Sequence, residues 1–549
     1  MKAIVLGGYG VFGSRLAELL VRDGHDVVVA GRSLSKARAL SMRLGCTPMA
    51  LDARAEPDAM FASLPDIVVD AAGPFQSYGR DPYAIPRLCI EHGADYLDLS
   101  DDAAFTTGLA VLDDQARAAK RRLLSGGSSV PGLSSSIAAD LCEGLDEILL
   151  IDTAILPGNR APRGASVISS IVGQLGTKSA VWRGGVWRDQ QCWSDSRRVR
   201  LAPDLERSGQ FIEVPDIVLF PAFFGARSVM FRAGMELGIM NIGMRAVALL
   251  RQRWMFDITP RRAALFQQFA NLFLPFGTDR GGMRVAVVGR RGTEVMRREW
   301  RLVAEAGDGP YIPAVAARAI IRRIEQVRPG ARPCLAEAPR AEMEQAMADL
   351  AVSTVKHEVP SPSLFEAVLA DRWADLPPEV QSLHSVQDIE SFSGKARVTR
   401  GGSLIARLAA WFFGFPAAAD ETPVTVVKTR TRQGETWERS FGGRVFRSHC
   451  TPSATRYRIR ERFWPFTFEM DLPLDDRSLR FPVRRGWCLG IPLPRFLLPK
   501  SESREYALNG VFHFDVALKA PFGAGLIVRY RGHLQPDRHN PAALPRAIA

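Results

Sequence analysis

Three glycines at a fixed spacing are the first residues in this sequence that could do chemistry. Gly8, Gly10 and Gly13 form the pattern Gly-x-Gly-x-x-Gly, with Val11 and Phe12 between the last two. The apolar run AIVLG precedes them, and the helical run SRLAELLV follows. Glycines between a strand and a helix allow close backbone approach to a phosphate, and the helix N-terminus offers free N–H groups. The pattern predicts binding of a dinucleotide pyrophosphate.

The residues after the second strand-like run, 26–30, indicate which dinucleotide binds. Arg32 and Ser33 follow this run, and Lys36 lies one helical turn later. A cation and a hydroxyl suit a ribose 2′-phosphate, whereas an NAD site places an acidic residue here. We therefore expect NADP, although Arg32 and Lys36 could instead be solvated charges at a helix start. Asp52, after the third run, is either an adenine contact or a turn residue.

A loop after the fourth strand-like run should approach the nicotinamide. It consists of Ala72, Gly73, Pro74 and Phe75. Ligands of open α/β sheets bind beyond the carboxyl ends of the strands, which is where this loop begins. Phe75 either presses on the nicotinamide ring or only closes the hydrophobic core.

Hydride transfer also needs a group that gives or takes a proton beside the reacting carbon. Candidate catalytic residues are Tyr78 and Asp98, which follow strand-like runs, and Thr177, which could reach in from a second domain. For Tyr78 and Asp98 a structural role remains equally open. Asp101 precedes an Ala-rich helical run, so we expect it to be a helix cap.

The elements that must position these residues change character along the chain. Residues 1–150 alternate short β-branched runs with helical patterns, which predicts a Rossmann-type doubly wound parallel sheet, an α/β fold. Residues 151–358 mix long strands and apolar helices, as an α+β substrate domain would. A Pro/Ser-rich linker is expected at 359–371, and period-2 alternation over 372–540 predicts a mostly-β C-terminal domain.

Composition limits the classes of protein that need to be considered. With 549 residues, 46% hydrophobic and 24% charged, the chain is a multidomain globular protein rather than a disordered or polytopic membrane protein. Its seven cysteines are scattered without a CxxC pair, so we expect no metal site and a reducing, cytoplasmic location. From Arg372 onward 27 basic residues face 17 acidic ones, which is most of the net +12.

A second class of function fits the basic last third. The apolar segments 251–277 and 403–416 are flanked or interrupted by arginines, as interfacial helices are. The alternative hypothesis is therefore a membrane-surface, lipid-binding protein that uses NADP as a structural ligand. Stripes of Leu and Phe more often indicate burial, so core or domain-interface helices are the preferred interpretation of both segments. No nucleic-acid motif is present, so nucleic acid is not an expected partner. The expected partners are a small-molecule substrate, which could be apolar or lipid-like, a peripheral membrane surface and a second copy in a homodimer.

The sequence resembles a known family at its N-terminal end. The phrases GGYGVFG, AGR, AGPFQSYG and GADYLDLSDD are similar to the N-terminal domain of saccharopine dehydrogenase-like NADP-dependent oxidoreductases. The resemblance continues more loosely to about residue 360. From about Arg372 the phrases WERSFGGRVFRS, GIPLPRFLLPKS and FHFDVAL resemble a domain of unknown function fused behind such cores.

The resemblance implies NADP at the glycine loop and Arg32, a nicotinamide beside Pro74 and Phe75, and a substrate cleft between the first two domains. It implies no single substrate class, because relatives handle amino-acid-derived imines, polyamine precursors and lipid-like enoyl or keto compounds. A tricarboxylate substrate would need several cations. The second domain offers four arginines that the sequence does not orient toward a cleft, namely Arg160, Arg163, Arg183 and Arg188.

Overall fold

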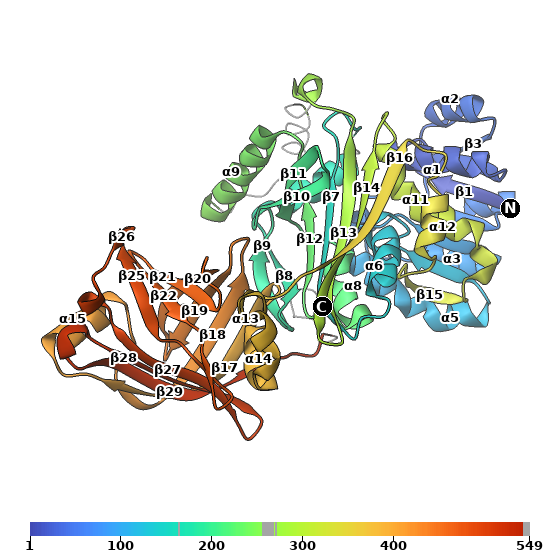
Figure 1. Cartoon of the computed structure of the whole chain (residues 1–549). Coiled ribbons are helices and arrows are strands. Elements are labelled where there is room, and N and C mark those ends of the chain that lie inside the picture. Colours follow the sequence, from blue (N-terminus) through green and yellow to red (C-terminus); the bar gives the residue numbers. More distant parts are fainter. Residues whose placement is uncertain (163–164, 255–267, 269–271, 542–549) are drawn as a thin grey trace.

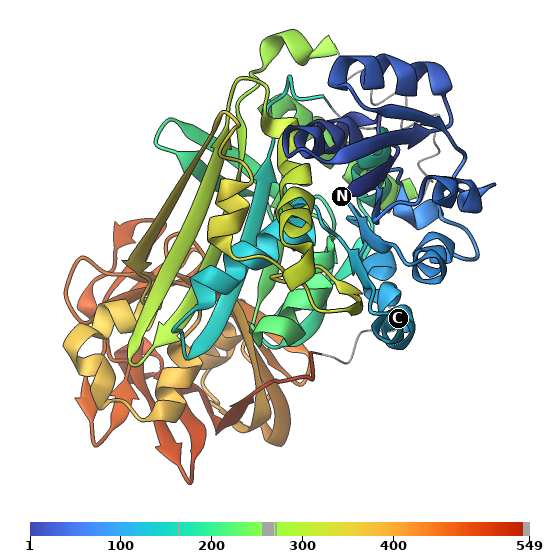
Figure 2. The same ribbon diagram turned by 90° about the vertical axis from the view of Figure 1, so that its right-hand side faces the viewer.

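Three layers built on β-sheets follow one another along the chain in the computed structural model (Figure 1). The structure describes residues 1–162, 165–254, 268 and 272–541. The first sheet, in blue, lies at one end of the molecule, the second, in green, at the centre, and the third, in orange to red, at the other end. The view turned by 90° keeps this order, with the third sheet on the side of the second that faces away from the first (Figure 2).

The first sheet is a parallel, doubly wound sheet, as expected. Its strands run in the spatial order β15, β6, β5, β4, β1, β2, β3. Their bounds are β1 (Lys2–Leu6), β2 (Asp26–Gly31), β3 (Thr47–Ala50), β4 (Ile67–Asp70), β5 (Asp95–Asp98), β6 (Arg122–Ser125) and β15 (Gly330–Pro333). The order reverses between β1 and β4, and ligands bind at such a switch point in open α/β sheets.

Helices cover both faces of this sheet because the strands are apolar on both sides. The helices are α1 (Val11–Arg22), α2 (Leu34–Leu44), α3 (Ala84–His92), α4 (Ala103–Gly108) and α5 (Asp113–Ala118). Helix α6 (Ser134–Cys142) follows β6 but packs against the second sheet. The central strands β1 and β4 are almost entirely buried, which explains their continuous β-branched sequences.

A distant part of the chain completes the first sheet. Strand β15 pairs in parallel with β6, although the sequence assigns its residues to the second domain. Helix α11 (Ile312–Arg322) packs against α1, and the guanidinium of Arg318 there binds Asp23 at 2.7 Å. The first and second layers are therefore joined by the segment from α11 to β15.

The second layer is a mixed sheet with helices, as expected of an α+β domain. Its spatial order is β10, β11, β12, β7, β13, β14, β16, with only β12 and β7 parallel. The bounds are β7 (Glu147–Leu156), β10 (Arg197–Ala202), β11 (Leu205–Phe211), β12 (Val229–Ala233), β13 (Gly281–Arg291), β14 (Glu294–Ala304) and β16 (Val352–Pro360). Beside it lie α7 (Ala165–Gln174), α8 (Pro215–Phe224), α9 (Gly238–Trp254) and the hairpin of β8 (Lys178–Arg183) and β9 (Val186–Gln191).

The third layer is one large antiparallel sheet that curls around its own hydrophobic core, which confirms the mostly-β prediction. Its spatial order is β23, β24, β27, β28, β29, β17, β18, β19, β20, β21, β22, β25, β26. The longer strands are β17 (Ile389–Arg400), β18 (Ala419–Arg430), β19 (Glu435–Phe441), β20 (Arg444–Pro452), β21 (Arg458–Phe463), β22 (Phe466–Asp471), β25 (Val483–Cys488), β27 (Lys500–Leu508), β28 (Val511–Lys519) and β29 (Leu526–Pro536). The short ones are β23 (Leu474–Asp475), β24 (Ser478–Arg480) and β26 (Ile491–Pro492). Helices α13 (Leu364–Leu369) and α14 (Pro378–His384) precede this sheet, and α15 (Leu404–Phe412) connects β17 to β18.

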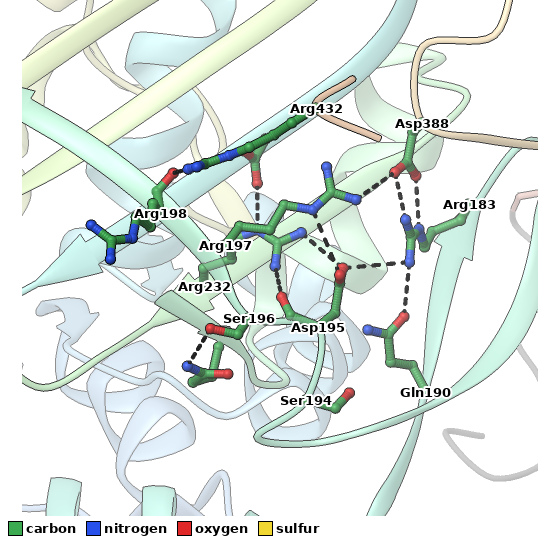
Figure 3. Close-up of polar contacts among 12 residues, drawn as sticks. Arg183, Gln190, Ser194, Asp195, Ser196, Arg197, Arg198, Arg232, Asp388 and Arg432 are labelled. Carbon is green, nitrogen blue, oxygen red and sulfur yellow. Dashed lines mark hydrogen bonds and ion pairs between the residues drawn. The ribbon is translucent and has the colours of Figure 1, made fainter. Parts of the chain in front are cut away.

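Buried charges join the second and third layers (Figure 3). Arg183 of β8 forms an ion pair with Asp388, which lies just before β17. Asp195 lies 3.7 Å from Arg183, and its carboxylate accepts a hydrogen bond from Arg232 at 3.0 Å. Arg197 approaches both Asp195 and Asp388. From the sequence, Arg183 was a candidate cation for an anionic substrate. In the structure its guanidinium instead pairs with Asp388 and joins two domains.

No helix among the described residues has the length and apolar character needed to cross a bilayer. Over the same residues, no group of metal-ligating side chains is close enough to hold an ion.

Candidate functional site

The glycine loop between β1 and α1 is shaped so that side chains are excluded. A Cβ on Gly13 would lie 2.4 Å from the Gly7 carbonyl oxygen, and one on Gly8 would lie 2.7 Å from the Val5 carbonyl oxygen. Gly7 itself has a φ of +64°, which favours glycine. Gly10 is the residue before α1 and has no side chain to cap the helix. The N–H groups at Val11 and Phe12 and the helix dipole are thus available to an anion, which is the geometry a dinucleotide pyrophosphate needs.

Tyr9 connects this loop to the end of β2. Its ring packs so closely on Gly31 that a Cβ there would lie 2.5 Å from a ring carbon. The Tyr9 hydroxyl accepts a hydrogen bond from the Ser33 N–H at 3.0 Å. Ser33 is the N-cap of α2 and accepts from the Lys36 N–H at 3.4 Å. Arg32 is exposed beside these residues and forms no ion pair with any described residue, so its guanidinium is available to a ligand.

The remaining cofactor candidates lie at the same edge of the sheet. Asp52 is exposed and accepts a hydrogen bond from the Arg54 N–H at 3.1 Å, as a turn residue does. The Ala72 N–H donates to Asp70 at 2.9 Å, which fixes the start of the loop after β4. Gly73, Pro74 and Phe75 continue this loop and line a cavity. Phe75 is 6% exposed and contacts the Phe105 ring, so it both closes the core and forms part of the cavity wall.

This cavity, of about 620 Å³, lies between the first two sheets. The loops that follow β4, β5 and β6 form one side, and residues of β7, β12, β13 and β14 form the other. Helix α9 and the start of α11 complete the wall. The lining is predominantly apolar and includes four methionines, Met235, Met240, Met244 and Met283. The expected cleft between the first two domains is therefore present as an apolar chamber that begins at the nucleotide-binding edge.

The charged residues that line the cavity are all acidic in the part of the chain described: Asp101, Glu213 and Asp279. Asp101 follows β5 and lines the same cavity as Pro74 and Phe75, and burial raises the pKa of its carboxyl group to about 6. Helix α4 is capped instead by Asp102, which accepts from the Phe105 N–H at 2.8 Å. The expectation that Asp101 is the cap is wrong, and Asp101 is a cavity residue that was not among the site candidates. The sequence did contain a signal for this residue. Asp101 and Asp102 are consecutive, and only one of them can be the N-cap, which leaves the other for a different role.

Asp98 is not among the residues that line the cavity, although Leu99 next to it is. Its side chain is inaccessible, and one oxygen accepts hydrogen bonds from the Ser100 N–H, the Ser125 hydroxyl and the Gly126 N–H at 2.8–2.9 Å. Burial raises the pKa of Asp98 to about 7. In this position Asp98 holds the ends of β5 and β6 together.

Tyr78 also lies outside the residues that line the cavity. Its hydroxyl donates to Asp70 at 2.9 Å, and burial raises the pKa of Tyr78 well above its ordinary value. Burial likewise raises the pKa of Asp70, to about 6. The guanidinium of Arg54 lies 4.7 Å from the centre of the Tyr78 ring. The structure thus brings Tyr78 and Asp70 together as a support for the loop after β4.

The described candidates from the second domain are also not among the residues that line the cavity. The Thr177 hydroxyl donates to the Gln174 carbonyl at 2.7 Å. Arg160 donates to the Pro275 carbonyl at 3.1 Å, and Arg188 donates to the Arg183 carbonyl at 3.2 Å. Arg163 lies outside the described residues.

Comparisons with known proteins agree with this architecture at both ends of the chain. Residues 3–127 match the family described as saccharopine dehydrogenase NADP binding domain, and residues 376–534 match a domain of unknown function, DUF4166. These matches confirm the resemblance seen in the sequence. The chain therefore carries a nicotinamide-dinucleotide-binding domain of the saccharopine dehydrogenase type followed by a DUF4166 domain. A search of curated proteins found no match.

Solved structures similar to this chain are distant in sequence. A saccharopine dehydrogenase (L-Glu forming) from Saccharomyces cerevisiae is 14% identical with a TM-score of 0.47, over 65% of this chain and 99% of that one. A homospermidine synthase from Legionella pneumophila is 12% identical with a TM-score of 0.41, over 66% and 92% of the two chains. A dehydrogenase from Chromobacterium violaceum is 13% identical with a TM-score of 0.30, over 64% and 94%.

Proposed function

We propose that this protein is an NADP-dependent oxidoreductase that transfers a hydride between the nicotinamide and a C=C or C=O bond of an apolar, lipid-like substrate. The observation that carries the proposal is the cavity. It begins at the loops beyond β4, β5 and β6, where a nicotinamide would lie, and continues as an apolar chamber into the second domain.

The residues at the first sheet fit the dinucleotide. The loop of Gly8, Gly10 and Gly13 leaves the space that a pyrophosphate requires, and the N-terminus of α1 supplies N–H donors. Arg32 and the Ser33 hydroxyl lie at the end of β2, where a ribose 2′-phosphate would need a cation and a donor. When bound, the reduced cofactor supplies the hydride.

The charge of the lining favours an apolar substrate over a tricarboxylate or an amino-acid-derived imine. A carboxylate taken into this chamber would lose its hydration and find no Lys or Arg among the described residues that line it. An alkyl or prenyl chain gains about 0.8 kcal/mol for each CH₂ that the chamber buries. Flexible methionines also adapt to chains of different shape.

Asp101 is positioned to supply the proton that must accompany the hydride. Because burial raises the pKa of its carboxyl group to about 6, part of the population is protonated near neutral pH. The carboxylic acid would donate this proton to the carbonyl oxygen, or to the α-carbon of a reduced enoyl group, and would recover it from solvent.

Turnover of NADPH against three substrate panels tests the proposal: apolar enoyl and keto compounds, amino-acid imines, and aliphatic amines with aldehydes. We expect oxidation of NADPH only with the first panel. Turnover confined to the imines or to the amines would contradict the apolar assignment. If NADPH binds but none of the panels is turned over, the proposal that the protein is an oxidoreductase would be contradicted.

A paired substitution in α9 tests the chamber directly. Gly243 lines the cavity and has open space beside it, so Gly243→Leu would occupy part of the chamber. Gly238 has equal space on the same helix but does not line the cavity, and Gly238→Leu is the matched control. We expect Gly243→Leu alone to raise KM for long-chain substrates while the affinity for NADPH stays unchanged.

A further inference from the structure

Helix α15 presents large apolar side chains to solvent. Its buried positions are the alanines Ala406 and Ala410. Its exposed apolar positions are Leu404, Ile405, Leu408, Trp411 and Phe412, each at least half exposed. A surface helix of a globular protein normally buries its Leu, Ile and aromatic residues and exposes polar ones. The arrangement in α15 is the reverse, so burial in the core of this chain does not explain these residues.

Further exposed apolar residues lie on turns of the third sheet. Trp464 is at the turn between β21 and β22 and is 78% exposed, and Leu489 and Ile491 are at the turn between β25 and β26. Phe496 and Phe522 lie on two short helical turns, Arg495–Leu497 and Pro521–Gly523. Each of these five side chains is more than half exposed.

Direct contacts connect these turns and α15 into one surface. The Ser403 hydroxyl, at the start of α15, donates to the Ala524 carbonyl at 2.6 Å, and the Phe522 and Phe496 rings lie 5.7 Å apart. At the other end of α15, the Phe412 ring lies 5.9 Å from the Phe466 ring. The Leu489 N–H donates to the Pro465 carbonyl at 3.0 Å, which joins the two hairpin turns.

We call this surface the apolar rim and define it as Leu404, Ile405, Leu408, Trp411, Phe412, Trp464, Leu489, Ile491, Phe496 and Phe522. It surrounds one end of the curled sheet. In Figure 1, α15 lies at the end of the third layer that is opposite the first layer, and β26 lies at the upper edge of the third layer.

Arginines surround the rim without acidic partners. Arg407, Arg444, Arg462 and Arg495 are exposed and form no ion pair with any described residue. The acidic residues nearest to α15 along the chain are already paired, Asp420 with Arg397 at 3.6 Å and Glu421 with Lys395 at 2.8 Å. The rim therefore combines apolar side chains with unneutralised positive charge.

An apolar cavity of about 150 Å³ lies directly behind this surface. Phe413 and Phe463, which are adjacent in sequence to the rim residues Phe412 and Trp464, line it together with the aromatic core of the sheet. Four charged residues also line it, namely Lys428, Arg439, Glu461 and Glu505.

We propose that the apolar rim docks this protein on a membrane that contains anionic lipids. The rim side chains would enter the boundary between headgroups and acyl chains, where Trp and Phe are favoured, and the four arginines would contact lipid phosphates. A second copy of the chain is a weaker occupant, because a two-fold contact through this surface would bring unpaired arginines face to face. The proposal stands independently of the substrate assigned above.

Co-sedimentation of the full chain with vesicles tests the proposal without cofactor or substrate. We expect binding to phosphatidylcholine vesicles that contain phosphatidylglycerol, much weaker binding to phosphatidylcholine alone, and weakening by salt. The double variant Leu408→Ser/Trp411→Ser removes two exposed side chains and should lower the affinity by about tenfold or more. Arg407→Glu/Arg495→Glu should remove the preference for anionic vesicles. The matched control is Met42→Ser/Val111→Ser, two exposed apolar residues outside the rim.

Absence of binding to anionic vesicles at low salt would overturn the proposal. Equal vesicle binding by the rim variant and the control would overturn it as well. Sedimentation velocity tests whether a second copy of the chain covers this surface instead. A wild-type dimer that becomes a monomer in the rim variant, together with no vesicle binding, would show that it does.

Discussion

The guanidinium of Arg183 binds both oxygens of the Asp388 carboxylate, at 2.7 and 2.5 Å, across 205 residues of sequence. Both side chains are buried, Arg183 to 8% and Asp388 to 3% exposure. This pair lies where the second layer meets the DUF4166 domain, so it ties the orientation of the C-terminal domain to the hairpin of β8 and β9. A buried pair of this kind gives little net stability against an apolar pair, but removal of one partner leaves the other charge uncompensated.

Asp388→Asn should therefore destabilise the junction by about 3–5 kcal/mol. Burial raises the pKa of Asp388, but attraction to Arg183 outweighs it and holds the pKa below its ordinary value. A carboxylate with a lowered pKa stabilises the folded state at pH above its unfolded value, about 4, and this contribution is lost as the pH falls further. Urea unfolding at several pH values measures both the loss of stability in the variant and the pH dependence of the wild type. Limited proteolysis between the domains shows whether the junction has opened. Asp420→Asn, exposed and 3.6 Å from Arg397, is the control and should change stability by less than about 0.5 kcal/mol.

Gly13→Ala should abolish cofactor binding. The added Cβ would lie 2.4 Å from the Gly7 carbonyl oxygen, so the loop must move and the pyrophosphate site must deform. We expect a loss of affinity for NADPH of at least about tenfold, measured by fluorescence titration. Gly402→Ala, at a glycine with open space beside it, should leave binding intact. Unchanged affinity in Gly13→Ala would mean that the dinucleotide does not use this loop.

Arg32→Asp should reverse the cofactor preference. The new carboxylate would repel a ribose 2′-phosphate and could bind the free 2′-hydroxyl of NADH. NADPH affinity should fall by about tenfold or more, while NADH affinity rises or stays the same. Arg38→Asp, an exposed arginine further along α2, is the matched control. A wild-type protein that binds NADH as tightly as NADPH would refute the NADP assignment.

Asp101→Asn should remove the proton donor. Since burial raises the pKa of Asp101 to about 6, the wild-type rate of reduction should decline as the pH rises through that value. The variant should lose about 10²–10⁴-fold in rate and show a flat profile over this range. Asp102→Asn keeps a good N-cap residue on α4 and should retain the wild-type profile. If Asp101→Asn keeps both the rate and the pH dependence, another group supplies the proton.

The parallel sheet was predictable because six of its strands alternate with helices in sequence, and all of these except the edge strand β3 are largely buried. Strand β15 was not, since four residues with little strand character acquire their structure only by pairing with β6. Within the site, the glycine loop and the loop of Pro74 and Phe75 could be found from sequence because each follows a strand that ends at the switch point.

The direction of individual side chains was harder to predict. Asp98 is the last residue of β5 and faces the loop after β6, whereas Leu99 and Asp101 line the cavity. Successive residues of an extended chain point to opposite sides, so a choice among Asp98, Asp101 and Asp102 depends on the position of the strand end to within one residue. The sequence locates the carboxylates at this edge of the sheet but does not tell which of them lines the cavity.

The position of strand β15 in the sequence delays completion of the first sheet during synthesis. The outer edge of β6 stays unpaired until Gly330 to Pro333 have left the ribosome, about 200 residues after β6 itself. At 5–20 residues per second this interval is roughly 10–40 s. An open strand edge during that time is a template for pairing with other nascent chains. We therefore expect a fragment that ends near residue 150 to aggregate, and the full chain to depend on chaperones while it is being made.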